Sequence, residues 1–95
     1  MSFYNTINLP KDLLIKELVK VKNQNLKVLT VFKVAGLIGL TPADVFNALS
    51  GLYPITSIRR AISDFTDDGK LIKTGEMRMG LYNQPNYVWI LKLNK

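Results

Sequence analysis

The 95-residue sequence predicts a single, mainly helical α+β domain in which four helices are followed by two strands. In the stretch ITSIRRAISDF, apolar residues recur at i, i+4 and i+7, the spacing of one buried helix face. The closing stretch NYVWILKL is dense in β-branched and aromatic residues, which favours a strand. The composition, 47% hydrophobic and 21% charged, is that of a globular protein.

The first two predicted helices cover residues 10–22 and 25–36. Each places apolar residues at helical spacing along one face. Asn25 is a residue type that caps helices, so we expect it to begin the second helix. Gly36 or Gly39 is expected to end it, because glycine adopts the left-handed conformation found at helix ends.

A strong start signal for a third helix lies in the stretch LTPAD. Thr41 is a cap residue, Pro42 fits the first helical position, and Asp44 lies where the helix dipole favours a carboxylate. Ser50-Gly51 is expected to close this short helix, and Leu52–Pro54 to lead tightly into the next one.

The fourth predicted helix covers residues 56–68. Thr56 or Ser57 is expected to cap its start, and Gly69 to stop it in the left-handed conformation. Its apolar stripe predicts that one side packs in the core while Arg59 and Arg60 point outward.

Two predicted strands, 70–74 and 86–93, are joined by a loop at 75–85 rich in glycine, asparagine and proline. Helix, short turn, helix and hairpin are the elements of a winged helix-turn-helix, a three-helix core plus a β-hairpin wing, here with an extra N-terminal helix. We therefore divide the chain into an N-terminal extension with the extra helix, 1–25, and a winged-helix domain, 26–95.

The chain is basic, with a net charge of +6 and a pI of about 9.7. This balance favours an acidic partner, and nucleic acid is the usual one. The charge is uneven: residues 1–40 carry net +4, residues 41–69 net −2 and residues 70–95 net +4. The alternative is a basic protein without such a partner.

Several function classes are disfavoured by what the sequence lacks. Without cysteine or histidine, we expect no disulfide, no metal site, no cofactor and no enzyme activity. The Asp64, Asp67 and Asp68 cluster is expected to be a polar helix end, because no cation-binding loop motif surrounds it. The apolar stretch 26–40 is shorter than the roughly 20 residues of a membrane span, and the N-terminal residues lack the pattern of a secretion signal.

The outward face of the fourth helix is the main candidate site. In helix-turn-helix proteins this face enters the DNA major groove and its N-terminal residues meet base edges. The residues expected on it are Thr56, Ser57, Arg59, Arg60 and Ser63. From the hairpin we expect further DNA contacts by Lys73, Arg78, Tyr82, Asn83 and Gln84.

The stretches LTPADVFNAL, YPITSIRRAISDFTDDGKLIKTGE and RMGLYNQPNYVWIL resemble small winged helix-turn-helix DNA-binding domains of bacterial, phage or mobile-element origin. The resemblance covers about residues 26–93, and the run TSIRRAI followed by DGKLIKT is its most specific part. It implies a module that binds double-stranded DNA, a small transcriptional regulator in the cytoplasm (nucleoid-associated, or in the host cell if phage-encoded), with Ser57, Arg59 and Arg60 at the recognition positions. Asn83-Gln84 stands where such domains often carry Gly-Arg, which implies a less charged wing.

Several alternatives stay open at this point. Arg60 and Asp64 have the i, i+4 spacing of an ion pair on a solvated helix face. The same scaffold can dock another protein, for example a phage protein on a host protein, and RNA is a third partner. The helix at 10–22 either packs on its own domain or pairs with a second copy into a homodimer. Tyr82 and Tyr87 could stack on bases or lie in the core, where we also expect Trp89.

Overall fold

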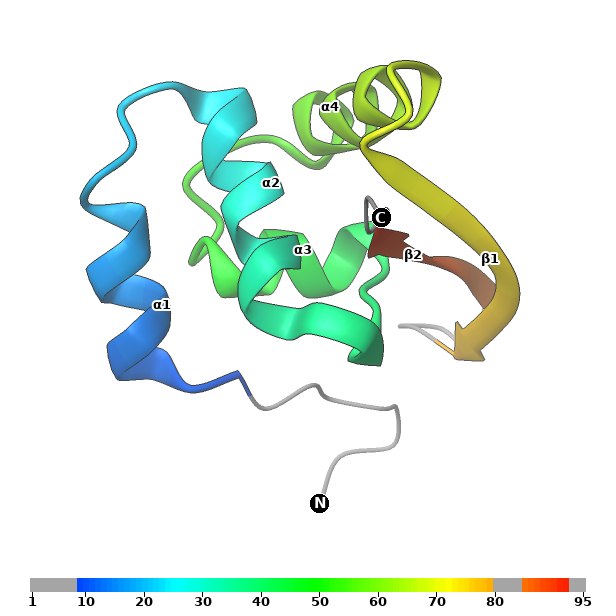
Figure 1. Cartoon of the computed structure of the whole chain (residues 1–95), viewed down its shortest axis with the longest axis horizontal. Helices are drawn as coiled ribbons and strands as arrows, with labels where there is room; N and C mark the ends of the chain where they lie inside the picture. Colours follow the sequence, from blue (N-terminus) through cyan, green and yellow to red (C-terminus); the bar gives the residue numbers. More distant parts are fainter. Residues whose placement is uncertain (1–8, 80–84, 93–95) are drawn as a thin grey trace.

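The computed structural model describes residues 9–79 and 85–92, which form an α+β domain (Figure 1). Its elements are, in chain order, α1 (Lys11–Leu18), α2 (Gln24–Ala35), the 3₁₀ turn η1 (Gly36–Ile38), α3 (Pro42–Ala48), α4 (Ile55–Asp67), β1 (Leu71–Met79) and β2 (Pro85–Leu91). The two strands form an antiparallel hairpin. The predicted α+β class is therefore confirmed, and the element order is compatible with a winged helix.

The core lies between α2, α3 and α4, with the hairpin closing one side. The larger side chains that are fully buried are Val28, Val31, Phe32, Leu40, Val45, Ile58, Ile62, Leu71 and Val88. Each such side chain contributes roughly 1.5–3 kcal/mol when it is removed from water. None of the helices in the described part of the chain combines the length and the apolar character needed to cross a bilayer.

Helix α1 packs on its own domain, against α2 (Figure 1). Leu14 is buried between them, and the ammonium of Lys27 donates a 2.9 Å hydrogen bond to the carbonyl of Leu18 at the end of α1. The helix is shorter than the predicted span 10–22. Beyond Leu18 the N–H groups of Lys20 and Val21 bond to the third preceding carbonyl, which tightens the chain into a turn.

Helix α2 is capped by Asn23, so the prediction of Asn25 is wrong by two residues. The Asn23 side chain accepts hydrogen bonds from the N–H groups of Asn25 (2.8 Å) and Leu26 (3.2 Å). These are the second and third helical positions, which a cap residue serves. Both asparagines suit a cap by type, and Asn23 is the one with the extended backbone a cap needs (φ −77°, ψ 130°).

A sharp turn after η1 connects the helices to the sheet. Gly36 ends α2 with a positive φ of 62°, as predicted. Gly39 then adopts φ 80° and ψ 157°, a region essentially restricted to glycine. Next along the chain, the Leu40 N–H and carbonyl each form a 2.9 Å hydrogen bond with Trp89 of β2. A Cβ on Gly39 would lie 2.5 Å from Val88 Cγ1, so this close approach needs glycine.

The start of α3 follows the prediction. Thr41 Oγ1 accepts the Asp44 N–H (3.2 Å), and Asp44 Oδ2 accepts the Thr41 N–H (3.0 Å), with Pro42 at the first helical position. This reciprocal capping box pairs two N–H groups that the helix itself leaves without partners. Ser50 and Gly51, both with positive φ, close the helix.

Helix α4 begins two or three residues earlier than a cap at Thr56 or Ser57 would place its start. Pro54 is the cap residue, with the extended φ −60° and ψ 147°, and its carbonyl accepts the N–H groups of Ser57 and Ile58. Thr56 and Ser57 lie inside the first turn, so the prediction that one of them caps the helix is wrong.

The end of α4 is the predicted glycine stop. Gly69 has φ 81°, and its N–H bonds to the carbonyl of Thr66 at 3.1 Å. The N–H of Lys70 bonds to the carbonyl of Phe65 at 2.8 Å. Together these two bonds form a Schellman motif, and the prediction of Gly69 is confirmed.

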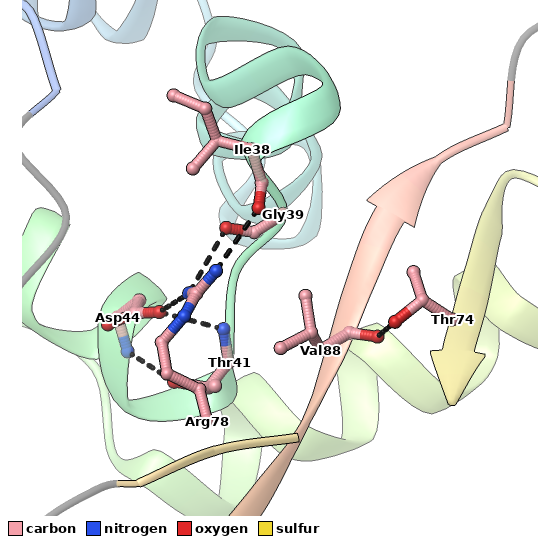
Figure 2. A network of polar contacts seen from close by, with 7 residues as sticks. All are labelled: Ile38, Gly39, Thr41, Asp44, Thr74, Arg78 and Val88. Atoms are coloured by element: carbon pink, nitrogen blue, oxygen red, sulfur yellow. Dashed lines mark hydrogen bonds and ion pairs between the residues drawn. The ribbon is translucent and has the colours of Figure 1, made fainter. Parts of the chain in front are cut away.

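The first strand is longer than predicted, because β1 continues through residues 75–79, which the sequence assigned to a loop. A bulge accommodates the glycine-containing part: Thr74, Gly75 and Glu76 lie between the paired residues Lys73 and Met77, opposite a single residue of β2. Thr74 Oγ1 donates to the carbonyl of Val88 (2.9 Å, Figure 2) and accepts the Glu76 N–H (3.0 Å). The threonine thus replaces backbone bonds that the bulge interrupts.

Candidate nucleic-acid interface

Helix α4 has two sharply different faces. Ile58, Ala61, Ile62 and Phe65 are buried in the core. The opposite face is exposed and polar; it comprises Thr56, Arg59, Arg60, Ser63, Asp64, Asp67 and Asp68, whereas Ser57 is half-buried. The prediction that both arginines lie off the buried stripe is therefore confirmed.

The two arginines of α4 have no carboxylate partner in the described part of the chain. There the ion pairs are Lys20–Glu17 and Arg78–Asp44. The alternative pair between Arg60 and Asp64 is not among them. Both guanidinium groups of α4 are thus exposed without neutralisation by a neighbouring acid within residues 9–79 and 85–92.

Although adjacent in sequence, the two arginines border different surfaces. A groove of about 500 Å³ runs between α4 and the hairpin. We call it the α4–hairpin groove; its walls include Arg59, Ser63 and Asp67 of α4 and Lys73, Tyr87 and Trp89 of the hairpin. The three α4 residues are spaced by four, which places them in one row along the helix. Arg60 does not line the groove and belongs to the outer surface of α4.

Lys73 is positioned by aromatic side chains. Its Cα pairs with that of Trp89 in the hairpin register, and its ammonium lies 3.8 Å from the centroid of the Tyr87 ring and 5.8 Å from that of Trp89. Contacts of this kind hold a cation over the negative face of a ring without neutralising it. Lys73 therefore presents its charge in the groove.

Trp89 is partly buried and packs against the core, in line with its predicted place, whereas Tyr87 is 41% exposed. The indole Nε1 of Trp89 is fully covered and has no hydrogen-bond partner among the described residues. A buried N–H without an acceptor is unusual in folded proteins. Sequence reasoning missed this donor, because a core tryptophan gives no sign of how its N–H is placed.

Arg78 has a different environment from the one predicted. Its Nη1 lies 2.8 Å from Asp44 Oδ2 and 3.3 Å from the carbonyl of Gly39, and its Nη2 lies 3.1 Å from the carbonyl of Ile38 (Figure 2). Its side chain is 11% exposed and that of Asp44 12%. The expected DNA contact by Arg78 does not fit this environment, because the nearly buried guanidinium joins the hairpin to the turn after η1 and to the first turn of α3.

The carboxylate of Asp44 serves two elements at once. Its Oδ2 accepts the N–H of Thr41 in the capping box and also the guanidinium of Arg78. The sequence indicates the first role, because Thr41 and Asp44 are near neighbours. It gives no sign of the second, since Arg78 lies 34 residues further along the chain.

Tyr82, Asn83 and Gln84 lie outside the described residues. Within residues 9–79 and 85–92, no three His, Cys, Asp or Glu side chains come together as metal ligands.

Comparisons with family models, with curated proteins and with solved structures gave no significant match to this chain.

Proposed function

We propose that the protein binds double-stranded DNA as a winged helix-turn-helix module, with the exposed face of α4 in the major groove and the hairpin against the backbone. One observation carries this proposal: α4 presents Arg59 and Arg60 off its buried face, exposed and without an acidic partner in the described residues. The other face is fixed in the core by Ile58, Ile62 and Phe65, so the arginines lie on a rigid element.

The chemistry of this face suits the edges of base pairs. The major groove is about 12 Å wide and admits an α-helix, and an arginine can form two hydrogen bonds to guanine O6 and N7. Thr56 and Ser63 add short hydroxyl side chains on the same exposed face, where they allow close approach. Arg60 on the outer surface is the residue we assign to base reading.

The charge distribution along α4 supports an orientation in which the N-terminal part of the helix meets the bases. Asp64, Asp67 and Asp68 are gathered toward its C-terminal end, and the arginines lie nearer the N-terminal end. Helix-turn-helix proteins contact bases with the N-terminal part of the recognition helix, so the acidic end would be held away from the phosphates. The net charge of +6 supplies the general attraction to DNA. Sequence-preferring binding of this kind fits a small transcriptional regulator.

A module that docks on another protein is the second candidate function, and exposed apolar side chains favour it. Leu37 and Ile38 of η1 and Leu52 before α4 are 74%, 53% and 74% exposed. Such apolar side chains favour contact with a protein more than with DNA. They lie outside α4, however, and no large apolar side chain of α4 is exposed. The polar α4 face therefore favours DNA as the ligand of that face.

The test compares two single charge removals. Helix α1 lies on the side of the molecule away from the hairpin (Figure 1), and its Lys16 is exposed, so Lys16→Ala controls for net charge. We expect Arg60→Ala to lose about 1–3 kcal/mol of binding free energy on a duplex selected from a random library, and to narrow the gap between that duplex and random DNA. Fluorescence anisotropy with labelled duplexes measures both quantities. Equal affinities for Arg60→Ala and Lys16→Ala would contradict the assignment of α4.

A further inference from the structure

We infer that the α4–hairpin groove is a seat for one phosphate group, held by Arg59, Lys73 and the indole N–H of Trp89. The inference deepens the proposed function and rests on it: in the complex, the phosphate is a phosphodiester of the DNA strand beside α4. A helix inserted in the major groove has a sugar–phosphate backbone on each side of it. The α4–hairpin groove runs along one side of α4, so it lies where one of these DNA backbones would pass.

The two walls of the groove come from different parts of the chain. Arg59 and Ser63 come from one row of α4, and Lys73, Tyr87 and Trp89 from one face of the hairpin. Tyr87 and Trp89 are two residues apart in β2, and Lys73 is the register partner of Trp89, so all three share that face. The groove therefore exists only in the folded domain, where α4 packs beside the hairpin.

The donors that line the groove match an acceptor with negative charge. Arg59 and Lys73 are cations without an acidic partner in the described residues, and Lys73 is held in place by the Tyr87 ring 3.8 Å away. Asp67 is the acidic residue of the lining, and it lies eight residues from Arg59, about 12 Å along the helix by its rise. A phosphate beside Arg59 is therefore separated from this carboxylate.

The Trp89 N–H is the independent observation that points to a ligand. Its Nε1 is covered by other atoms of the protein and finds no acceptor among residues 9–79 and 85–92, while the Trp89 side chain lines the groove. A phosphate oxygen therefore reaches this N–H only when the indole turns or the atoms that cover it move aside. Such a donor is costly to leave unpaired, and an oxygen that reaches it gains a charge-assisted hydrogen bond. A phosphate oxygen carries negative charge and accepts several hydrogen bonds at once, so it can serve this N–H and the two cations together.

The chain offers a direct optical test, because Trp89 is its single tryptophan. The full-length protein is titrated with a random-sequence duplex and, separately, with inorganic phosphate, while Trp89 emission and duplex affinity are recorded. Lys73→Met removes the cation and keeps the apolar stem; Trp89→Phe removes the N–H and keeps an aromatic ring. Lys70→Met is the matched control, since Lys70 also lies over a ring (5.7 Å from the Phe65 centroid) but does not line the groove.

We expect the emission of Trp89 to change as duplex is added, and the change to saturate. Lys73→Met should bind duplex about tenfold more weakly with a salt slope reduced by about one unit, and Trp89→Phe about tenfold more weakly with an unchanged slope. Lys70→Met should change affinity less than either. All three variants are compared by circular dichroism melts, so that a folding defect is recognised.

The outcomes separate this inference from the proposed function. If the parent binds duplex but Trp89 emission stays constant and Lys73→Met and Trp89→Phe bind like the parent, the phosphate seat is wrong and DNA binding stands. If duplex is not bound but inorganic phosphate changes Trp89 emission saturably and Lys73→Met abolishes that change, the groove binds free phosphate and the DNA proposal falls. If the parent protein does not bind duplex and phosphate does not change Trp89 emission, both the phosphate seat and the DNA-binding proposal are wrong.

Discussion

Arg78 is the residue whose surroundings most change the interpretation of the hairpin. Its guanidinium contacts the backbone carbonyls of Ile38 and Gly39, between α2 and α3, and the carboxylate of Asp44 in the first turn of α3. Arginine suits this position because its donors form a planar fork that reaches several acceptors at once. The hairpin is thereby attached to the helices by side-chain bonds as well as by packing.

We expect Arg78→Ala to lower the free energy of unfolding by roughly 2–4 kcal/mol. The change leaves the nearly buried Asp44 carboxylate without its cation and two backbone carbonyls without this donor. The expected loss of stability lies between that of a hydrogen bond to a charged group and that of a broken buried ion pair. Urea unfolding measures the loss.

The matched control for this ion pair is Lys20→Ala. Lys20 pairs with Glu17 at 3.4 Å, but these side chains are 60% and 39% exposed. Exposed pairs contribute little, so we expect a change below about 1 kcal/mol. If Arg78→Ala unfolds at the same urea concentration as Lys20→Ala, the structural role of Arg78 is wrong.

At the scale of residues, whether the environment of a side chain can be predicted depends on how far apart in the sequence its contact partners lie. Exposure along α4 follows from helical spacing, so the outward position of Arg59 and Arg60 is predictable. The contact of Arg78 with Asp44 joins residues 34 positions apart, and no local pattern encodes it. The unpaired Trp89 N–H and the cation over Tyr87 depend equally on how the hairpin packs.

At the scale of elements, the turn at Gly39 connects the helices to the sheet. A Cβ there would meet Val88 and would also force a side chain into a backbone conformation reserved for glycine. We expect Gly39→Ala to cost about 2–4 kcal/mol of stability, through strain and overpacking together. Thermal or urea unfolding provides the measurement.

Gly69→Ala is the comparison for that experiment. Gly69 also has a positive φ, 81°, but a Cβ there would meet nothing within 4 Å. Its replacement therefore adds only the backbone strain, about 1 kcal/mol. If Gly39→Ala lowers the free energy of unfolding no more than Gly69→Ala does, the contact with Val88 does not constrain the turn.

The elements themselves were predictable where local signals agree. The capping box at Thr41 and Asp44, the buried stripe of α4 and the stop at Gly69 all follow from residues within a few positions of one another. The start of α4 was missed because Pro54 supplies the cap conformation by its backbone. The extent of β1 was missed because Gly75, a typical loop residue, lies in a bulge that only the pairing with β2 defines.

At the scale of the whole molecule, a homodimer through the first helix, one of the two alternatives for that helix, stays a hypothesis. Leu14 of α1 is part of the core, but Ile15 and Val19 are 59% and 71% exposed. If two copies meet there, Ile15→Glu with Val19→Glu should convert a dimer to a folded monomer at micromolar concentration, measured by sedimentation. Truncating α1 would be a poorer test, because it removes Leu14 as well. A parent chain that sediments as a monomer over this range would contradict the dimer.

The central claim, that the protein binds duplex DNA through a basic surface, is tested most directly by its affinity for random-sequence duplex across a salt series. We predict binding at low salt and a linear fall of log affinity with log salt, with a slope of about −0.9 for each phosphate neutralised. Circular dichroism at each salt concentration verifies that the chain stays folded. A folded protein that binds no duplex at the lowest salt, or whose affinity does not change with salt, would contradict the claim.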